Sequence, residues 1–187
     1  MNLKSTLVAF ALPLFLATAV SAQTEPTPSS TFPKPMRSAQ GDWAPHVGLV
    51  AGLAAPEGSF DNTASIGIDV GYQPYIPFGL GAELTYYRAP GDGVNGALER
   101  TQLLGKGTYN FGGDLFLIKY SYIGLGLGVN YQPSELQLVS APMIGFDIPV
   151  ASIRENPLTL GANARYAILE GDNADVFSLN GEIKVWY

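Results

Sequence analysis

Apolar and polar residues alternate along most of the chain after position 43, and the alternation is cleanest at its end. Between Val176 and Tyr187, one face reads Phe, Leu, Gly, Ile, Val and Tyr, and the other reads Ser, Asn, Glu, Lys and Trp. Side chains of a β-strand point alternately to its two faces, so a period of two predicts a strand with one apolar and one polar face.

The same alternation recurs seven times upstream, in segments of roughly the ten residues that a tilted strand needs to cross a bilayer. The predicted strands are Trp43–Ala54, Ala64–Gln73, Phe78–Arg88, Glu99–Phe111, Tyr122–Tyr131, Ala141–Val150 and Leu158–Leu169. The sixth is the weakest, because prolines stand at both its ends. The run 115–119, apolar up to its final Lys119, is expected to be a bulge or a packed turn. The pattern predicts an all-β fold, an eight-stranded antiparallel up-and-down transmembrane β-barrel.

The aromatic residues sort into two groups along the predicted strands. Eight strands place both ends of the barrel on one side, which for an exported barrel is the periplasm. Expected at the periplasmic ends are Trp43, Tyr72, Phe78, Tyr109, Phe111, Tyr122 and Tyr187. Expected at the outer ends are Tyr86, Tyr131, Tyr166 and Phe177. Two aromatic belts are typical of membrane proteins at the two lipid–water interfaces.

The chain divides into three parts. Residues 1–22 combine a basic start, a short apolar run and small residues at a cleavage site, which predicts a secretory signal peptide. Residues 23–42 are rich in Pro, Thr and Ser, with little apolar content, and are expected to form a disordered periplasmic linker. Residues 43–187 are the predicted barrel. No later segment reaches eighteen apolar residues, so no transmembrane helix is expected in the mature chain.

Composition narrows the function classes. The 16 acidic residues exceed the 10 basic ones, which argues against nucleic acid as a partner. Charged residues make up only 14% of the chain, below the usual value of about 25%. There is no cysteine, which excludes a lipoprotein anchor, a disulfide framework and thiolate metal sites.

The polar faces of the predicted strands carry four acids and four bases. An eight-stranded barrel is barely wide enough inside for its own side chains, and an unpaired charge there is costly. We therefore expect an interior ion-pair network that plugs the lumen, with a gated narrow pore through it as the alternative. The candidate residues are Asp69, Glu83, Arg100, Lys106, Asp147, Arg165, Glu182 and Lys184.

Candidate catalytic chemistry is sparse. A lipid hydrolase needs a nucleophile beside a base. The single histidine, His46, is predicted to face the lumen near the periplasmic end. Ser65 also faces the lumen, but it lies toward the opposite end of the barrel. The acidic segment Glu170–Asp175 lacks calcium-loop spacing, so only weak divalent-ion bridging to lipopolysaccharide phosphates is considered there. We expect no enzyme, no cofactor and no metal site.

The signal peptide, the eight alternating strands and a last strand ending in an aromatic residue resemble the small outer-membrane β-barrel proteins of Gram-negative bacteria, the OmpA-type transmembrane domain and its relatives. The segments Tyr109–Gly113 and Tyr122–Gly128 add to this resemblance. It implies that the last strand is the signal read by the barrel-assembly machinery, with Ile183, Val185 and Tyr187 matching its spacing. Two features depart from it: the predicted outer loops are short, and the segment 112–119 is not a tight turn.

The resulting hypothesis is a monomeric integral outer-membrane β-barrel with a structural role in envelope integrity. Its expected partners are outer-membrane lipids, lipopolysaccharide and, during biogenesis, the assembly machinery. A narrow channel for small solutes is the alternative. Two further hypotheses are a lipid-modifying enzyme and a soluble lipocalin-like carrier. In the carrier, the apolar faces of the strands would point into the barrel.

Overall fold

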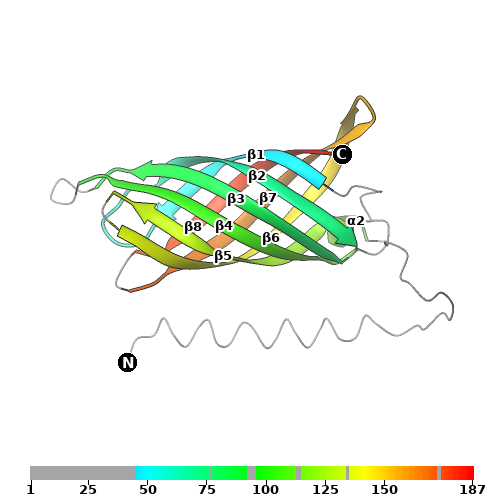
Figure 1. Cartoon of the computed structure of the whole chain (residues 1–187). Helices are drawn as coiled ribbons and strands as arrows, with labels where there is room; N and C mark the ends of the chain where they lie inside the picture. The colour runs from blue at the N-terminus through cyan, green and yellow to red at the C-terminus, as the bar shows by residue number, and fades with distance from the viewer. Residues whose placement is uncertain (1–44, 76, 92–95, 113–114, 134, 172–173) are drawn as a thin grey trace. The chain divides into compact units, whose positions relative to one another are not determined.

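The computed structural model describes residues 45–75, 77–91, 96–112, 115–133, 135–171 and 174–187. In this part of the chain, eight antiparallel strands form one closed barrel in chain order (Figure 1). They are β1 (Pro45–Pro56), β2 (Thr63–Tyr75), β3 (Phe78–Ala89), β4 (Leu98–Asn110), β5 (Ser121–Gln132), β6 (Glu135–Ile153), β7 (Asn156–Leu169) and β8 (Val176–Trp186). The predicted fold class, an eight-stranded antiparallel up-and-down barrel, is confirmed.

The barrel is closed by β1 pairing with β8, from His46 opposite Trp186 to Pro56 opposite Val176. When the register of each ladder is followed around the barrel from His46, the path returns to β1 at Pro56, ten residues farther along. Ten residues of stagger over eight strands tilt the strands by about 40°. We call the end where β1 begins and β8 ends the proximal end, and the opposite end the distal end.

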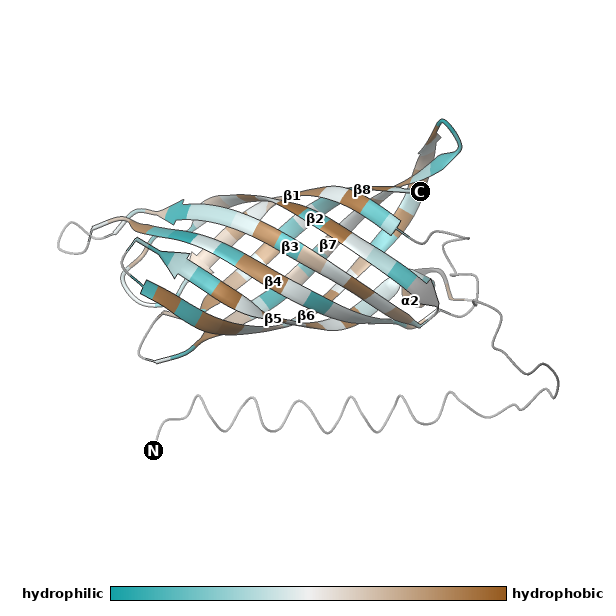
Figure 2. Ribbon diagram, viewed as in Figure 1, coloured by the Kyte–Doolittle hydropathy of each residue, from teal (hydrophilic) through white to brown (hydrophobic). Residues whose placement is uncertain are grey.

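Long apolar side chains cover the outside of the barrel and polar side chains fill its inside. Leu125 on β5 and Leu160 on β7 are 48% and 45% exposed, whereas Asp69 and Glu83 are each 1% exposed. Along each strand, hydrophobic positions alternate with polar or small ones (Figure 2). This is the reverse of a soluble barrel, so the polarity of the predicted faces is confirmed.

Strand β6 differs most from its prediction. We expected Ala141–Val150, but β6 has 19 residues and is the longest described strand. Pro142, which lacks an N–H, removes only one donor, and the ladders to β5 and β7 carry the strand past it. The run 115–119, expected to be a bulge or packed turn, instead contains a short helix, α2 (Phe116–Lys119).

The β6–β7 hairpin projects beyond the rim at the proximal end (Figure 1). Its two-residue turn has Arg154 and Glu155 at φ values of 51° and 74°, as a type I′ turn requires. The β6–β7 register shifts between Pro149 and Ala151. A β-bulge of this kind is common at barrel rims, where it redirects the strand. Ile153, near the turn, is 50% exposed.

Besides the buried polar residues Arg100, Gln102, Asn130 and Gln137, the distal half of the interior holds an apolar cluster. This cluster draws on β1, β3, β4, β6, β7 and β8, and consists of Ala54, Tyr87, Leu104, Val139, Ala141, Ala167, Leu169 and Val176. Polar residues fill the proximal half and middle. The buried apolar side chains are therefore concentrated in the distal half, whereas the ion-paired charges lie in the proximal half and middle.

The expected aromatic belts need one correction. Tyr122 was expected in the lipid-facing aromatic belt at the periplasmic, or proximal, end, but it is buried inside the barrel. Its position on β5, one residue out of phase with the outward-facing Ile123, explains the error. Trp43, the signal peptide 1–22 and the linker 23–42 lie outside the described residues. The described residues include no helix long and apolar enough to span a membrane.

Two glycines offer a matched test of the barrel wall. A Cβ added at Gly128 would lie 1.9 Å from the Leu103 carbonyl oxygen, whereas a Cβ at Gly107 would meet no atom within 4 Å. We predict that Gly128→Ala lowers the free energy of unfolding by about 1–3 kcal/mol through overpacking, and that Gly107→Ala leaves it nearly unchanged. Urea unfolding of both variants measures the difference. Equal stabilities would contradict the β4–β5 register.

Candidate functional site

The interior ion-pair network is organised around two carboxylates that face each other. Asp69 and Glu83 are register partners on β2 and β3, and directly opposed like charges destabilise a sheet. Lys106 on β4 relieves this conflict, because its Nζ lies 2.7 Å from Asp69 Oδ1 and 2.9 Å from Glu83 Oε2. Arg165, on β7 across the lumen, pairs with the other oxygen of Glu83. It also donates to Thr85 Oγ1 at 3.2 Å.

Lys184 on β8 is the centre of a second set of contacts. Its Nζ lies 2.5 Å from Glu182 Oε2 and 2.9 Å from Asp147 Oδ2. Glu182 also accepts a hydrogen bond from Asn163 on β7. This set continues through Asn180 to Ser65, with donor–acceptor distances of 3.1 and 3.2 Å.

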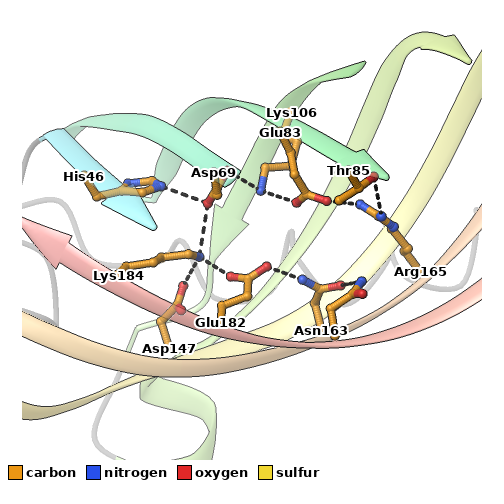
Figure 3. Close-up of polar contacts among 11 residues, drawn as sticks. His46, Asp69, Glu83, Thr85, Lys106, Asp147, Asn163, Arg165, Glu182 and Lys184 are labelled. Carbon is orange, nitrogen blue, oxygen red and sulfur yellow. Dashed lines mark hydrogen bonds and ion pairs between the residues drawn. The ribbon is translucent and has the colours of Figure 1, made fainter. Parts of the chain in front are cut away.

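One long contact joins the two sets: Lys184 Nζ lies 3.6 Å from Asp69 Oδ2 (Figure 3). We call this contact the seam. The Glu83 half on one side of it comprises His46, Asp69, Glu83, Thr85, Lys106 and Arg165. The Glu182 half on the other side comprises Ser65, Asp147, Asn163, Asn180, Glu182 and Lys184.

His46 joins the network at the proximal mouth. Its Nε2 lies 3.0 Å from Asp69 Oδ2, and its ring centroid lies 4.4 Å from that of Trp186. Trp186 in turn donates from Nε1 to Thr159 Oγ1 at 3.1 Å. Gly71, opposite His46 on β2, leaves room for the imidazole, because a Cβ there would lie 2.2 Å from His46 Cε1.

A small cavity at this mouth brings solvent to the network. Its volume is about 40 Å³, enough for a few water molecules, since one needs about 10–15 Å³. Its polar and aromatic lining includes His46, Asp69, Gln73, Lys106, Tyr122, Asp147, Lys184 and Trp186. We call this cavity the vestibule.

Seven of the eight predicted network residues are connected by these ion pairs, and Arg100 is the exception. Arg100 is 2% exposed in the distal half, where it donates to Tyr87 Oη at 3.3 Å and to the Ala174 carbonyl at 2.8 Å. When the side-chain amide of Gln132 is turned so that its oxygen faces Arg100, this oxygen accepts two further hydrogen bonds from the guanidinium group. The expectation that Arg100 joins the network was wrong, because the face of a residue does not tell its height along the barrel axis.

His46 and Ser65, the candidate base and nucleophile, lie far apart along the barrel. His46 pairs with Gly71, and Ser65 pairs with Gly52 six residues farther along β1, a separation of about 20 Å. Ser65 donates to Asn180 rather than to a base. Among the described residues, no group of three or more His, Asp or Glu side chains is placed to hold a metal ion.

The three residues matched to an assembly signal share the outer face of the last strand. Ile183 is 50% exposed, Val185 is half-buried, and Tyr187, just after β8, is 63% exposed. The uncharged members of the network were missed as site residues. Thr85, Asn163 and Asn180 lie on the inward phase of their strands, and that phase was the only signal that pointed to them.

Comparison with known proteins identifies no family for this chain. No family model matches the sequence, and no curated protein matches it. Among solved structures, it is similar to the crystal structure of the outer membrane protein OprG from Pseudomonas aeruginosa, with 12% identity and a TM-score of 0.39. The match covers 81% of this chain and 95% of that one. The proposals below rest on the geometry of this chain.

We predict that Lys184→Met destabilises the barrel strongly. The change leaves Asp147 and Glu182 buried without their shared cation, and breaking a buried ion pair costs about 3–5 kcal/mol. The exposed Arg88 provides a matched control, and Arg88→Met should shift stability by no more than about 0.5 kcal/mol. Urea titrations of both variants against wild type measure the effect. Equal losses would show that Lys184 does not hold the network together.

Proposed function

We propose that this chain is an integral outer-membrane β-barrel protein with a structural role in the envelope, and that its lumen is filled rather than open. The observation that carries the proposal is the polarity of the barrel, with apolar side chains outside and an ion-pair network inside. An apolar surface that surrounds a whole barrel far exceeds the patches that soluble monomers expose.

The closed sheet supports a location in lipid. In hydrocarbon every backbone N–H and C=O must be satisfied within the protein, and among β-structures only a closed barrel achieves this. Pairing of β1 with β8 leaves the barrel without a free edge along its shared length. A soluble lipocalin-like carrier needs the opposite arrangement, with apolar residues lining a cavity and polar residues outside.

The contents of the lumen support a structural role. Ion-paired charges fill the proximal half and middle, and the apolar cluster fills the distal half together with buried polar residues such as Arg100 and Gln137. An eight-stranded barrel leaves little space beyond its own side chains. On this proposal the proximal end faces the periplasm, and the outer surface contacts membrane lipids and lipopolysaccharide as a monomer. Ile183, Val185 and Tyr187 are then read by the assembly machinery before insertion.

A narrow channel for small solutes is the second candidate, and the vestibule favours it. The vestibule gives solvent access to charged groups from the proximal end, as the entrance of a pore would. Conduction would also require a path through the distal apolar cluster. Discrete conductance steps in planar bilayers would favour the channel over the filled barrel.

A pair of apolar residues with matched exposure tests the membrane location. Leu125, in the middle of β5, is 48% exposed, and Ile153, on the projecting hairpin, is 50% exposed. We predict that Leu125→Arg costs roughly 2–4 kcal/mol in lipid vesicles, the penalty for Arg at the bilayer midplane. Ile153→Arg, beyond the rim, should cost no more than about 1 kcal/mol. Urea unfolding in vesicles measures both, and equal costs would place Leu125 outside hydrocarbon.

The envelope role is tested in cells. A strain lacking the protein should become more sensitive to detergents and to large antibiotics, because a structural component of the barrier is missing. Wild-type protein should restore resistance, whereas the Leu125→Arg variant should not. Fractionation of the same cells should recover the wild-type protein with outer membranes. An unchanged sensitivity would argue against the structural role, and recovery in a detergent-free soluble fraction would contradict the membrane location itself.

A further inference from the structure

His46 and Lys184 compete for the same atom. Asp69 Oδ2 lies 3.0 Å from His46 Nε2 and 3.6 Å from Lys184 Nζ. Its other oxygen, Oδ1, is held by Lys106 at 2.7 Å. The Lys184 contact is the seam, the ion pair that joins the two halves of the network (Figure 3).

The charge balance of the network depends on His46. The connected residues include four carboxylates (Asp69, Glu83, Asp147 and Glu182) and three permanent cations (Lys106, Arg165 and Lys184). With neutral His46, four minus three leaves one excess negative charge, and Arg100, which could offset it, lies apart in the distal half. A proton on His46 supplies the missing positive charge.

The geometry at His46 allows this proton to enter. The contact to Asp69 assigns the Nε2–H tautomer, which leaves a lone pair on Nδ1, and Nδ1 is buried without a hydrogen-bond partner among the described residues. The side chain is 11% exposed and lines the vestibule. Histidine is the side chain whose charge ordinarily changes between about pH 5 and 8.

We propose that His46 is a proton-binding switch that opens the seam at the proximal mouth. A proton from solvent adds to Nδ1, and the resulting imidazolium holds Asp69 Oδ2 more strongly while it repels the ammonium of Lys184. Lys184 gives up its longest contact at low cost, because it keeps Asp147 at 2.9 Å and Glu182 at 2.5 Å. The Glu83 half and the Glu182 half then separate, and the vestibule widens.

Charged and titratable groups from five other strands face His46 across the vestibule. They are Asp69 on β2, Lys106 on β4, Tyr122 on β5, Asp147 on β6 and Lys184 on β8. The two lysines oppose protonation of the imidazole and the two carboxylates favour it. Of these carboxylates, Asp69 is the one in direct contact with His46.

Trp186 reports on both steps. The chain has two tryptophans, so Trp43→Phe leaves Trp186, packed against His46, as the single emitter. In detergent micelles, we expect its fluorescence to fall as the pH is lowered from about 8 to 5, the range in which histidine side chains ordinarily gain a proton. We also expect quenching by neutral acrylamide to become steeper at acid pH, since a wider vestibule admits the quencher. Protonation alone changes the first signal but not the second.

Two further variants in this background locate the effect. His46→Gln should lose both pH dependences, while Ser178→Ala, at a buried serine outside both halves of the network, should keep both. If the fluorescence changes with pH but the acrylamide quenching does not, the proposed opening of the seam is wrong. If the fluorescence does not change with pH, the proposal that His46 binds the proton is wrong. The single-tryptophan protein alone can give either result, even if His46→Gln does not fold.

A flux measurement separates this inference from the proposed function. The distal apolar cluster does not contact the seam and remains closed when the seam opens, so vesicles holding the protein should stay ion-tight at both pH values. Acid-induced ion flux would contradict the filled lumen and favour the channel, but it would not contradict the inference that the seam opens. Failure to insert into vesicles would contradict the membrane location. Neither outcome bears on the micelle experiment.

Discussion

Closure of the sheet by β1 and β8 is the constraint on which the rest of this structure depends. Once the last strand pairs with the first, the shared length of the barrel has no free edge, and backbone polar groups are satisfied by neighbouring strands. Only then can the outer face be apolar around its whole circumference. Closure also defines an inside, and the two-residue period of each strand sends every second side chain there. The stagger of ten residues sets how these inward side chains meet.

The narrow interior then limits which residues can occupy it. Long charged side chains fit where the paired residue on the neighbouring strand is a glycine, which has no side chain. Gly48 is an example, because a Cβ there would lie 2.8 Å from Cγ of Lys184, its partner on β8. Gly71 does the same for His46. Part of the high glycine content of the chain is thus the counterpart of the ion-pair network.

The sequence pattern predicted the strands and their facing well, because strand alternation is local and survives changes of register. It did not predict which inward residues meet. Arg100 and His46 illustrate this: both were placed on inward faces, but the stagger puts Arg100 among neutral partners in the distal half and brings His46 to Asp69. The length of β6 was missed because prolines normally end strands, and here two flanking ladders carry the strand through Pro142.

The two halves of the lumen solve the same packing problem differently. The distal half is packed with apolar side chains such as Leu104 and Val139, whose burial is itself favourable, together with Arg100 and its uncharged partners. Charges fill the other half, although buried ion pairs often contribute no more stability than apolar residues of similar volume. Stability alone therefore does not explain why ion-paired charges are concentrated in the proximal half and middle. These charges lie where solvent enters and where His46 contacts Asp69, which makes this end of the barrel the place where a function beyond filling the lumen would reside.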